Sequence, residues 1–144
     1  MNNRLGLKKD RGSHVLIQDK KEEANVIAEN FNISFQYLDT TQKYGSSFRD
    51  WQECGWLSKM LETLQGYCHK PLNQQFDGYK FKAYTGYPPS KKTEFSYPPN
   101  IPPDAHWARI HILNTAVVVG HYVGNTFYVV FLDKTHKFYK KDKQ

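Results

Sequence analysis

The chain has 144 residues, a length typical of one domain, and carries 20 Lys and Arg against 14 Asp and Glu, for a net charge of +6. No stretch approaches the roughly 20 apolar residues of a membrane-spanning helix, and the aromatic share of 15% is too high for a disordered protein. The positive charge favours nucleic acid, an anionic surface or an acidic protein as the partner.

The N-terminal residues are basic but lack the apolar segment of a secretory signal, so we expect a soluble, cytoplasmic protein. Cys54 and Cys68 should then stay reduced, and two cysteines 14 residues apart, without His at the spacing of zinc ligands, do not match a zinc site. We expect both to be small buried apolar residues. We also expect one domain over 1–144, with basic flexible ends at about 1–12 and 140–144, and no cofactor or resident metal.

The first third of the chain predicts a helix and a strand. The apolar run at 15–17 is compatible with a short strand, and Asp19 offers an N-cap for a helix over about 20–30. Residues 31–39 alternate between apolar and polar side chains, which predicts a half-buried strand.

The strongest helical pattern covers residues 47–66. Ser47 can cap the first turn, and Asp50 three residues later completes a capping-box pattern. Gly55 weakens the middle of this helix, and Gly66 is placed to end it.

Residues 71–104 are less regular. Alternation over 79–83 predicts an edge strand, and the three Pro-Pro pairs between 88 and 103 predict an extended connector. The aromatic residues of this connector favour packing on their own domain, with partner binding as the alternative.

The C-terminal part predicts an antiparallel meander. Three β-rich runs cover 107–113, 115–122 and 126–132, and Gly124-Asn125 suits a two-residue hairpin turn. The sequence therefore predicts an α+β fold, whose central antiparallel sheet combines this three-strand meander with one or two further strands. Two helices should cover the sheet, and apolar residues on both faces of the strands predict either cover on both sides or a position at the centre of the sheet.

Two-residue turns in both hairpins would place four side chains on one face of the sheet: Arg109, His111, Tyr122 and Asp133. His121 would then lie on the other face beside Tyr128, and a one-residue slip in register would exchange these groupings. A structural role is the alternative for each strand histidine. Spacing gives only weak support to a metal site made from His106, His111 and His121.

The segment after the last strand carries side chains suited to phosphate chemistry. His136 and Tyr139 are candidate acids, bases or orienting groups, and Lys134 and Lys137 could hold a phosphate. The alternative is a turn capped by Asp133, with aromatic side chains docked on the core. Cations mixed with aromatic rings also suit base stacking and phosphate binding. Four residues are candidate nucleic-acid contacts: Lys137, Tyr122, His111 and His121.

The run Val119–Tyr122, the run Asn125–Asp133, His136 and Tyr139 together resemble the C-terminal signature of a family of small bacterial mobile-element proteins. The similarity extends upstream and covers about residues 33–139.

A weaker likeness is to RelE-type toxins, which are small basic RNA-cleaving proteins with helices over an antiparallel sheet. That likeness implies catalytic roles for Arg109, His136 and Tyr139, with Lys134 or Lys137 supplying charge. This chain departs from such toxins in its greater length and in its proline-rich insert.

These features predict a toxin-like or defence-associated RNA-binding protein and, more narrowly, a metal-independent ribonuclease. Four residues would be catalytic: His136, Tyr139, Arg109 and Lys134. The alternative is a non-enzymatic interaction protein encoded by a mobile element, such as an inhibitor, adaptor or complex subunit. Its binding anchors would be Tyr87, Tyr97 and Trp107. The expected partners are RNA or a protein such as an antitoxin, and not a membrane.

Overall fold

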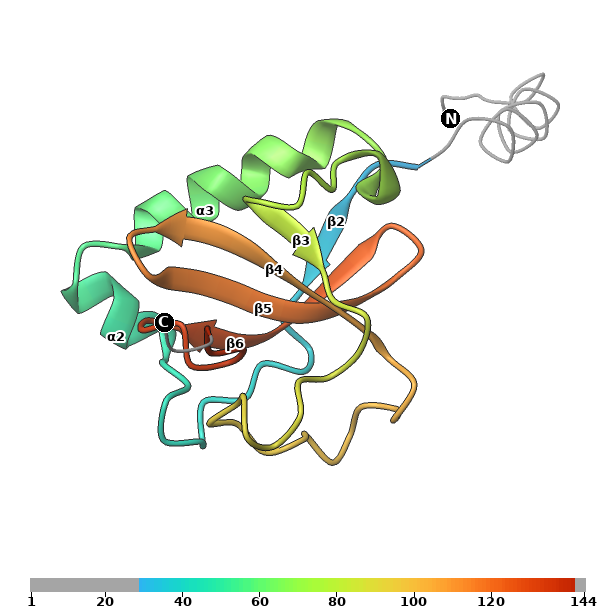
Figure 1. Cartoon of the computed structure of the whole chain (residues 1–144). Coiled ribbons are helices and arrows are strands. Elements are labelled where there is room, and N and C mark those ends of the chain that lie inside the picture. The colour runs from blue at the N-terminus through green and yellow to red at the C-terminus, as the bar shows by residue number, and fades with distance from the viewer. Residues whose placement is uncertain (1–28, 142–144) are drawn as a thin grey trace, which may run out of the picture.

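The computed structural model describes residues 29–141, which form one five-stranded sheet with helices on one side (Figure 1). The strand order is β2-β6-β5-β4-β3, and the α+β fold predicted from the sequence is confirmed. The run at 15–17 and nearly all of the helix predicted at 20–30 lie outside the described residues. Within the described residues, no helix is long and apolar enough to cross a bilayer.

The predicted meander forms the centre of the sheet. Its strands are β4 (His106–Leu113), β5 (Ala116–Val123) and β6 (Thr126–Asp133), paired antiparallel in sequence order. The turn at Gly124-Asn125 has two residues, as expected, because Val123 pairs with Thr126. Gly124 has a φ of +57°, a conformation that glycine adopts without steric cost.

Two short strands complete the sheet. β3 (Phe81–Ala83) pairs antiparallel with β4 at one edge, where the sequence predicted an edge strand. At the other edge β2 (Asn32–Ser34) pairs parallel with β6, so the sheet is mixed instead of wholly antiparallel. The strand predicted over 31–39 ends at Ser34, whose hydroxyl oxygen accepts a hydrogen bond from Gln36 N at 3.1 Å and starts a turn.

The helix predicted over 47–66 is two helices, α2 (Phe48–Glu53) and α3 (Leu57–Gly66). The prediction of one continuous helix is wrong because Gly55 has a φ of +78°, which ends the helical path. The predicted capping box is confirmed: Ser47 Oγ accepts from Asp50 N at 3.0 Å, and Asp50 Oδ2 accepts from Ser47 N at 2.9 Å.

The connection from α3 to β3 contains two short 3-10 turns, Tyr67–His69 and Leu72–Gln74. The cysteines do not behave as one buried pair. Cys68 is partly buried, whereas Cys54 follows the last residue of α2 and is exposed, so the expectation that both are buried is wrong for Cys54.

Each face of the sheet carries its own hydrophobic core, as the apolar residues on both faces predicted. The helix-side core packs Trp51, Met60 and Leu64 of the two helices against the sheet. The opposite core has no helix among the described residues. It is covered by the proline-rich loop (84–105) and the C-terminal segment (134–141), through residues such as Phe138. The loop runs below the sheet in Figure 1, coloured yellow to orange.

Two β-bulges change the predicted grouping of side chains. On β4 a bulge lies between His111 and Leu113, and on β6 Val130 is an extra residue opposite the Val119–Gly120 step. Each bulge shifts the register by one residue. Arg109, His111 and Asp133 consequently share the loop-covered face with His121, and Tyr122 lies on the helix side. The predicted grouping with Tyr122 is therefore wrong, whereas the neighbourhood of His121 and Tyr128 is confirmed.

Candidate functional site

A pocket of about 630 Å³ opens on the loop-covered face of the sheet. It brings together three of the four residues predicted to be catalytic, Arg109, His136 and Tyr139. The remaining lining residues are Lys82, Ala83, Tyr84, Thr85, Lys92, Lys140 and Lys141.

A second pocket of about 490 Å³ adjoins the first and shares Arg109, His136, Lys140 and Lys141 with it. Its other lining residues are His111, Asn114, Thr115 and Lys137. We call the two adjoining pockets the basic groove. Arg109 and His136 line both pockets, so these two side chains stand where the two halves of the groove meet.

Asp133 holds the turn that presents His136. Its side chain is 0% exposed at the end of β6, and its carboxylate oxygens accept hydrogen bonds from Lys137 N at 3.0 Å and Phe138 N at 2.8 Å. This turn places His136 at a φ of +62°. The sequence left open whether this segment is a turn capped by Asp133 or a catalytic segment. The structure contains the capped turn, and this turn places His136 in the groove.

The Arg109 guanidinium lies 2.8 Å from the His136 imidazole, measured from Nη1 to Nε2. A guanidinium can only donate, so Nε2 accepts this hydrogen bond and the imidazole is neutral, with its proton on Nδ1. Burial lowers the pKa of His136, and the charge of Arg109 lowers it further. Arg109 Nη2 also donates to Tyr79 O at 3.3 Å, and its Nε is buried without a hydrogen-bond partner among the described residues.

Two stacked tyrosines form one wall of the groove. The rings of Tyr84 and Tyr139 lie 5.2 Å apart with an interplanar angle of 24°. Tyr84 is fixed from behind by Phe138 at 5.7 Å and through its backbone N–H, which donates to Trp107 O at 2.9 Å. Burial is the main reason that the pKa of Tyr84 rises to about 12, so its hydroxyl stays protonated.

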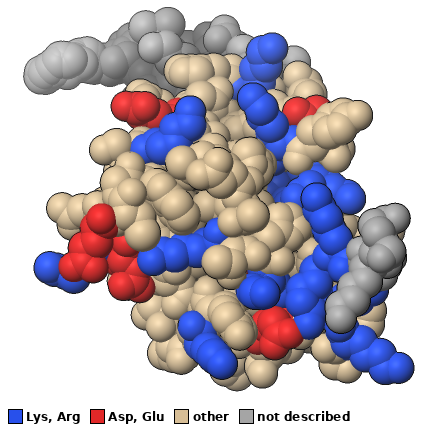
Figure 2. Space-filling model, turned by 60° about the vertical axis from the view of Figure 1, so that its left-hand side comes forward, with Lys and Arg blue, Asp and Glu red and all other residues tan. Residues whose placement is uncertain are grey.

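Lysines surround these groups. Lys82 of β3 lies directly opposite Arg109 on β4, and the backbone N–H of Lys140 donates to Lys92 O at 2.7 Å. Lys140 also pairs with Glu94, and this contact lowers the pKa of the Glu94 carboxyl. Figure 2 shows Lys and Arg side chains gathered on the right of that view, with few acidic side chains among them.

Two residues predicted to bind or act at the site lie elsewhere. Lys134 lies close enough to Asp50, in the first turn of α2, to lower the pKa of that carboxyl, and it lines neither half of the groove. Tyr122 packs in the helix-side core, 5.3 Å from the ring of Phe76.

Two other predicted nucleic-acid contacts differ in position. His111 lines the smaller pocket, where its Nε2 lies 2.8 Å from Asn114 O. His121 is buried away from the groove, with its ring 5.5 Å from Tyr37 and 4.9 Å from Tyr128. Spacing gave only weak support to a metal site made from His106, His111 and His121, and within residues 29–141 no group of three His, Cys, Asp or Glu side chains is placed to hold a metal ion.

Of the three candidate partner-binding anchors, Trp107 lies inside the loop-side core, and Tyr87 and Tyr97 are partly buried against it. Trp107 is 1% exposed, and its ring contacts Tyr87 at 5.0 Å and Tyr97 at 5.7 Å. The Tyr87 hydroxyl donates to Phe95 O at 3.1 Å, and the Tyr97 hydroxyl donates to Pro102 O. These rings hold the proline-rich loop on its own domain.

Among the charged and aromatic residues of the groove, sequence reasoning missed five: Lys82, Tyr84, Lys92, Lys140 and Lys141. Lys82 sits in the predicted edge strand, so a correct register with β4 would have placed it beside Arg109. Lys140 was assigned to a flexible tail, but it is tied to the loop because Glu94 N donates to Lys137 O at 3.0 Å beside the Lys140–Lys92 bond.

Comparisons of the chain with models of protein families, with curated proteins and with solved structures find no match. The resemblances seen in the sequence motifs therefore stay predictions, and the function has to be argued from the groove itself.

Proposed function

We propose that this protein binds RNA in the basic groove and cleaves it by attack of a ribose 2′-hydroxyl group, with side chains supplying the acid, the base and the cation. The observation that carries the proposal is the Arg109–His136 hydrogen bond of 2.8 Å within a groove lined by lysines. A neutral imidazole beside an obligate cation supplies a base and a phosphate ligand at the same place.

Arg109 would act as the phosphate ligand and as the group that releases His136. A guanidinium carries five N–H donors, so it can turn a pair of them toward a phosphate. Its bond to Nε2 of His136 would then be exchanged for bonds to phosphate oxygens, and that nitrogen would be free to accept a proton. Lys82, which lies opposite Arg109, would add positive charge near the phosphate.

The reaction balances with groups that line the groove. His136 takes the proton of the 2′-hydroxyl group, the 2′-oxygen bonds to phosphorus, and the bond from phosphorus to the 5′-oxygen breaks. Tyr139 gives its hydroxyl proton to the departing 5′-oxygen, and water returns the proton from His136 to Tyr139. The products are a 2′,3′-cyclic phosphate and a 5′-hydroxyl end. Lys134 has no part in this scheme because it does not line the groove.

The test is cleavage of an end-labelled RNA in the presence of EDTA, comparing wild type with His136→Asn. Asparagine tolerates the positive φ of residue 136, so this change removes the base with little backbone strain. We expect the rate to fall by about 10² to 10⁴, the usual contribution of one acid–base group.

His106→Asn is the matched control, since His106 stacks on Tyr122, which packs on the helix side of the sheet. It should cleave within about twofold of wild type, because a surface change outside the site leaves acid–base catalysis intact. Unchanged cleavage by folded His136→Asn, or no cleavage by wild type, would refute the ribonuclease proposal.

We further propose a toxin-like or defence-associated role, which rests on the resemblance of the C-terminal motif and on the same groove. Induced expression in bacteria should arrest growth with early loss of RNA, and His136→Asn should relieve both effects. Normal growth with intact RNA at full expression would remove support for a toxin.

The interaction-protein alternative has less support, since Trp107 is buried in the loop-side core and the partly buried rings of Tyr87 and Tyr97 pack against it.

A further inference from the structure

We infer that Tyr139 is a stacking platform for one base, so that the groove takes single-stranded RNA with an unpaired nucleotide in its larger half. This inference rests on the proposed RNA binding and adds the class of substrate. It starts from the Tyr84–Tyr139 stack, whose ring centroids are 5.2 Å apart at an angle of 24°.

The stack is supported by the core on its inner side. Tyr84 contacts Phe138 of the loop-side core at 5.7 Å, so it supports Tyr139 from behind. Tyr139 itself is half-buried and lines the larger pocket, and Tyr84 is its only aromatic contact within residues 29–141. A base that adds to the outer face of Tyr139 would extend an existing stack without reorganising the wall.

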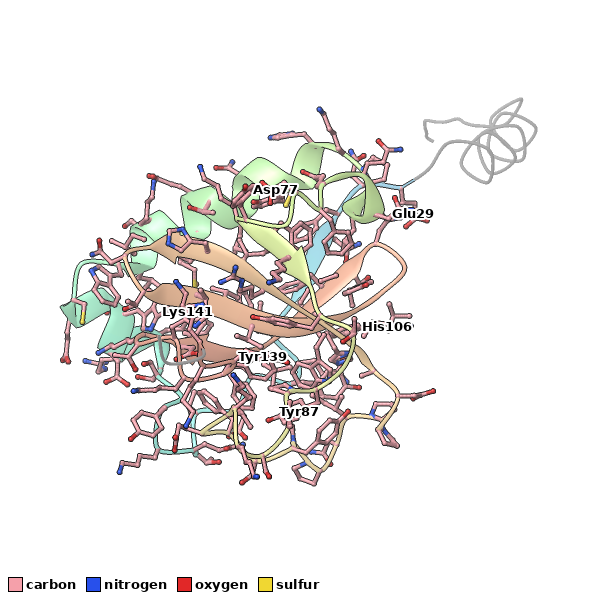
Figure 3. The ribbon with its side chains drawn as sticks, in the orientation of Figure 1. Glu29, Asp77, Tyr87, His106, Tyr139 and Lys141 are labelled. Atoms are coloured by element: carbon pink, nitrogen blue, oxygen red, sulfur yellow. The ribbon has the colours of Figure 1, made fainter. Side chains whose placement is uncertain are left out.

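The position of Tyr139 relative to the cations suits a nucleotide. Tyr139 and Lys141 are labelled close together on the near side of the sheet in Figure 3, and both line the larger pocket with Arg109. A base on the ring therefore has its phosphate within the reach of cations. Base–aromatic stacking and a positively charged groove are the two elements of single-strand recognition.

The volumes of the two halves of the groove support binding of two successive nucleotides, one in each half. The volumes of about 630 and 490 Å³ both fall within the range of small-molecule pockets, about 300 to 1,000 Å³. Arg109 and His136 line both halves, so a phosphate held there would connect one nucleotide on the Tyr139 side with the next beside His111.

The stacking geometry predicts that the bound RNA is single-stranded. In a duplex both faces of each base are covered by its neighbours, so the Tyr139 ring could not reach one without opening the helix. An unpaired base offers a free face. Because every base has such a face, we expect little preference for base identity at Tyr139.

Binding is measured with a 2′-O-methyl RNA oligonucleotide, which cannot be cleaved because its 2′-oxygen carries no proton. Fluorescence anisotropy compares Tyr139→Leu, which loses the ring, with Tyr139→Phe, which keeps it. We expect Tyr139→Leu to bind about 5-fold or more weakly, a typical loss for one base–aromatic stack. Tyr139→Phe should bind within about twofold of wild type. The same oligonucleotide annealed to its complement should bind at least about 10-fold more weakly than the single strand.

A second binding experiment uses only the wild-type protein, so its result does not depend on the folding of Tyr139→Leu. A fully abasic oligonucleotide keeps every phosphate and lacks every base. Wild type should therefore bind it at least about 5-fold more weakly than the ordinary strand. Equal affinity of wild type for the abasic and ordinary strands would overturn the inference. Equal affinity for duplex and single strand would also overturn it. Displacement of the RNA by polyglutamate of equal charge would overturn it as well, since an acidic protein would then fit the groove equally well.

Cleavage of ordinary RNA by the same variants separates this inference from the ribonuclease proposal. Tyr139→Phe should bind normally but cleave slowly, whereas Tyr139→Leu should lose both. Wild type that binds with these preferences and never cleaves would refute the ribonuclease alone. Wild type that cleaves, while Tyr139→Leu binds as wild type does, would refute the stacking platform alone.

Discussion

Arg109 adds to burial in keeping the imidazole of His136 neutral. Its Nη1 donates to His136 Nε2 at 2.8 Å, and its charge adds to burial in lowering the pKa of His136. The imidazole therefore stays neutral at physiological pH, which is the state that a general base requires before it acts.

Replacing Arg109 with Gln should raise the pKa of His136, because the neutral amide no longer repels the proton. The shift is measured by NMR titration of the imidazole signals. Lys134→Gln is the control, since it also removes one positive charge but lies outside the groove. A His136 titration that is identical in wild type and Arg109→Gln would show that the contact does not govern its protonation.

His121 is a second buried imidazole, and it affects how the stability of the protein depends on pH. Neither ring nitrogen has a hydrogen-bond partner among the described residues, and burial lowers the pKa of His121 below the usual histidine value of 6.5. The unfolded chain therefore takes up a proton near that pH while the folded protein does not. Stability is fully present above this range and is lost as pH falls through it toward the folded pKa.

His121→Phe should stabilise the protein at pH 7 by about 1 kcal/mol, because it removes two unsatisfied buried nitrogens. The new ring can keep the contacts with Tyr37 and Tyr128. Stability should also fall less between pH 7 and pH 5, although the lowered pKa of His136 leaves part of that dependence. Urea unfolding at both pH values measures the two effects. A variant less stable than wild type at pH 7 would contradict this account.

At the scale of elements, the close approach of β5 and β6 at their bulge requires Gly120. A Cβ atom there would lie 2.1 Å from Tyr128 O and 2.9 Å from Tyr128 C, which are backbone atoms held in the sheet. Val130 is the extra residue of this bulge, and the bulge turns Asp133 toward the loop-covered face, where it anchors the His136 turn.

Gly120→Ala should destabilise the protein by about 2 kcal/mol or more, the order expected for a forced overlap in a packed core. Gly66→Ala is the matched control, since a Cβ at the end of α3 meets no atom within 4 Å. It should be neutral or stabilising by up to about 1 kcal/mol. Thermal unfolding compares the two variants, and equal melting temperatures would show that the bulge accommodates a side chain.

Local patterns explain which elements could be predicted. The capping box of Ser47 and Asp50 and the Gly124-Asn125 turn depend on neighbours in sequence, and both are confirmed. The bulges depend on pairing between strands and leave no trace in the alternation of apolar residues. For that reason the sequence assigned Tyr122 to the wrong face. Arg109 and Asp133 still share a face, as predicted, because β4 and β6 each contain one bulge.

At the scale of the whole molecule, the two faces of the sheet have different roles. The helix-side core is built by α2 and α3, whereas the proline-rich loop and the C-terminal segment cover the other face and form much of the groove. His136 and Tyr139 were candidates through their chemistry, and the likeness to RelE-type toxins added Arg109 as a third catalytic residue. The contribution of Tyr84 and Lys92 could not be predicted, because it depends on contacts between the loop and the chain end.

If RNA binds in the groove, as proposed, its affinity should depend on where the positive charges lie and not on the total charge. For single strands, the slope of log K against log salt is about −0.7 for each neutralised phosphate. Lys82→Gln, in the groove opposite Arg109, should therefore make the slope less steep by about 0.7.

Lys59→Gln removes the same charge from the exposed side of α3, whose Met60 and Leu64 face the helix-side core, and should leave the slope unchanged. Titrations of a 2′-O-methyl RNA at several salt concentrations measure both slopes. If the two variants change the slope equally, RNA is attracted by net charge alone and the groove is not the binding site. If only Lys82→Gln changes it, the phosphates lie on the face of the sheet that carries Arg109 and His136.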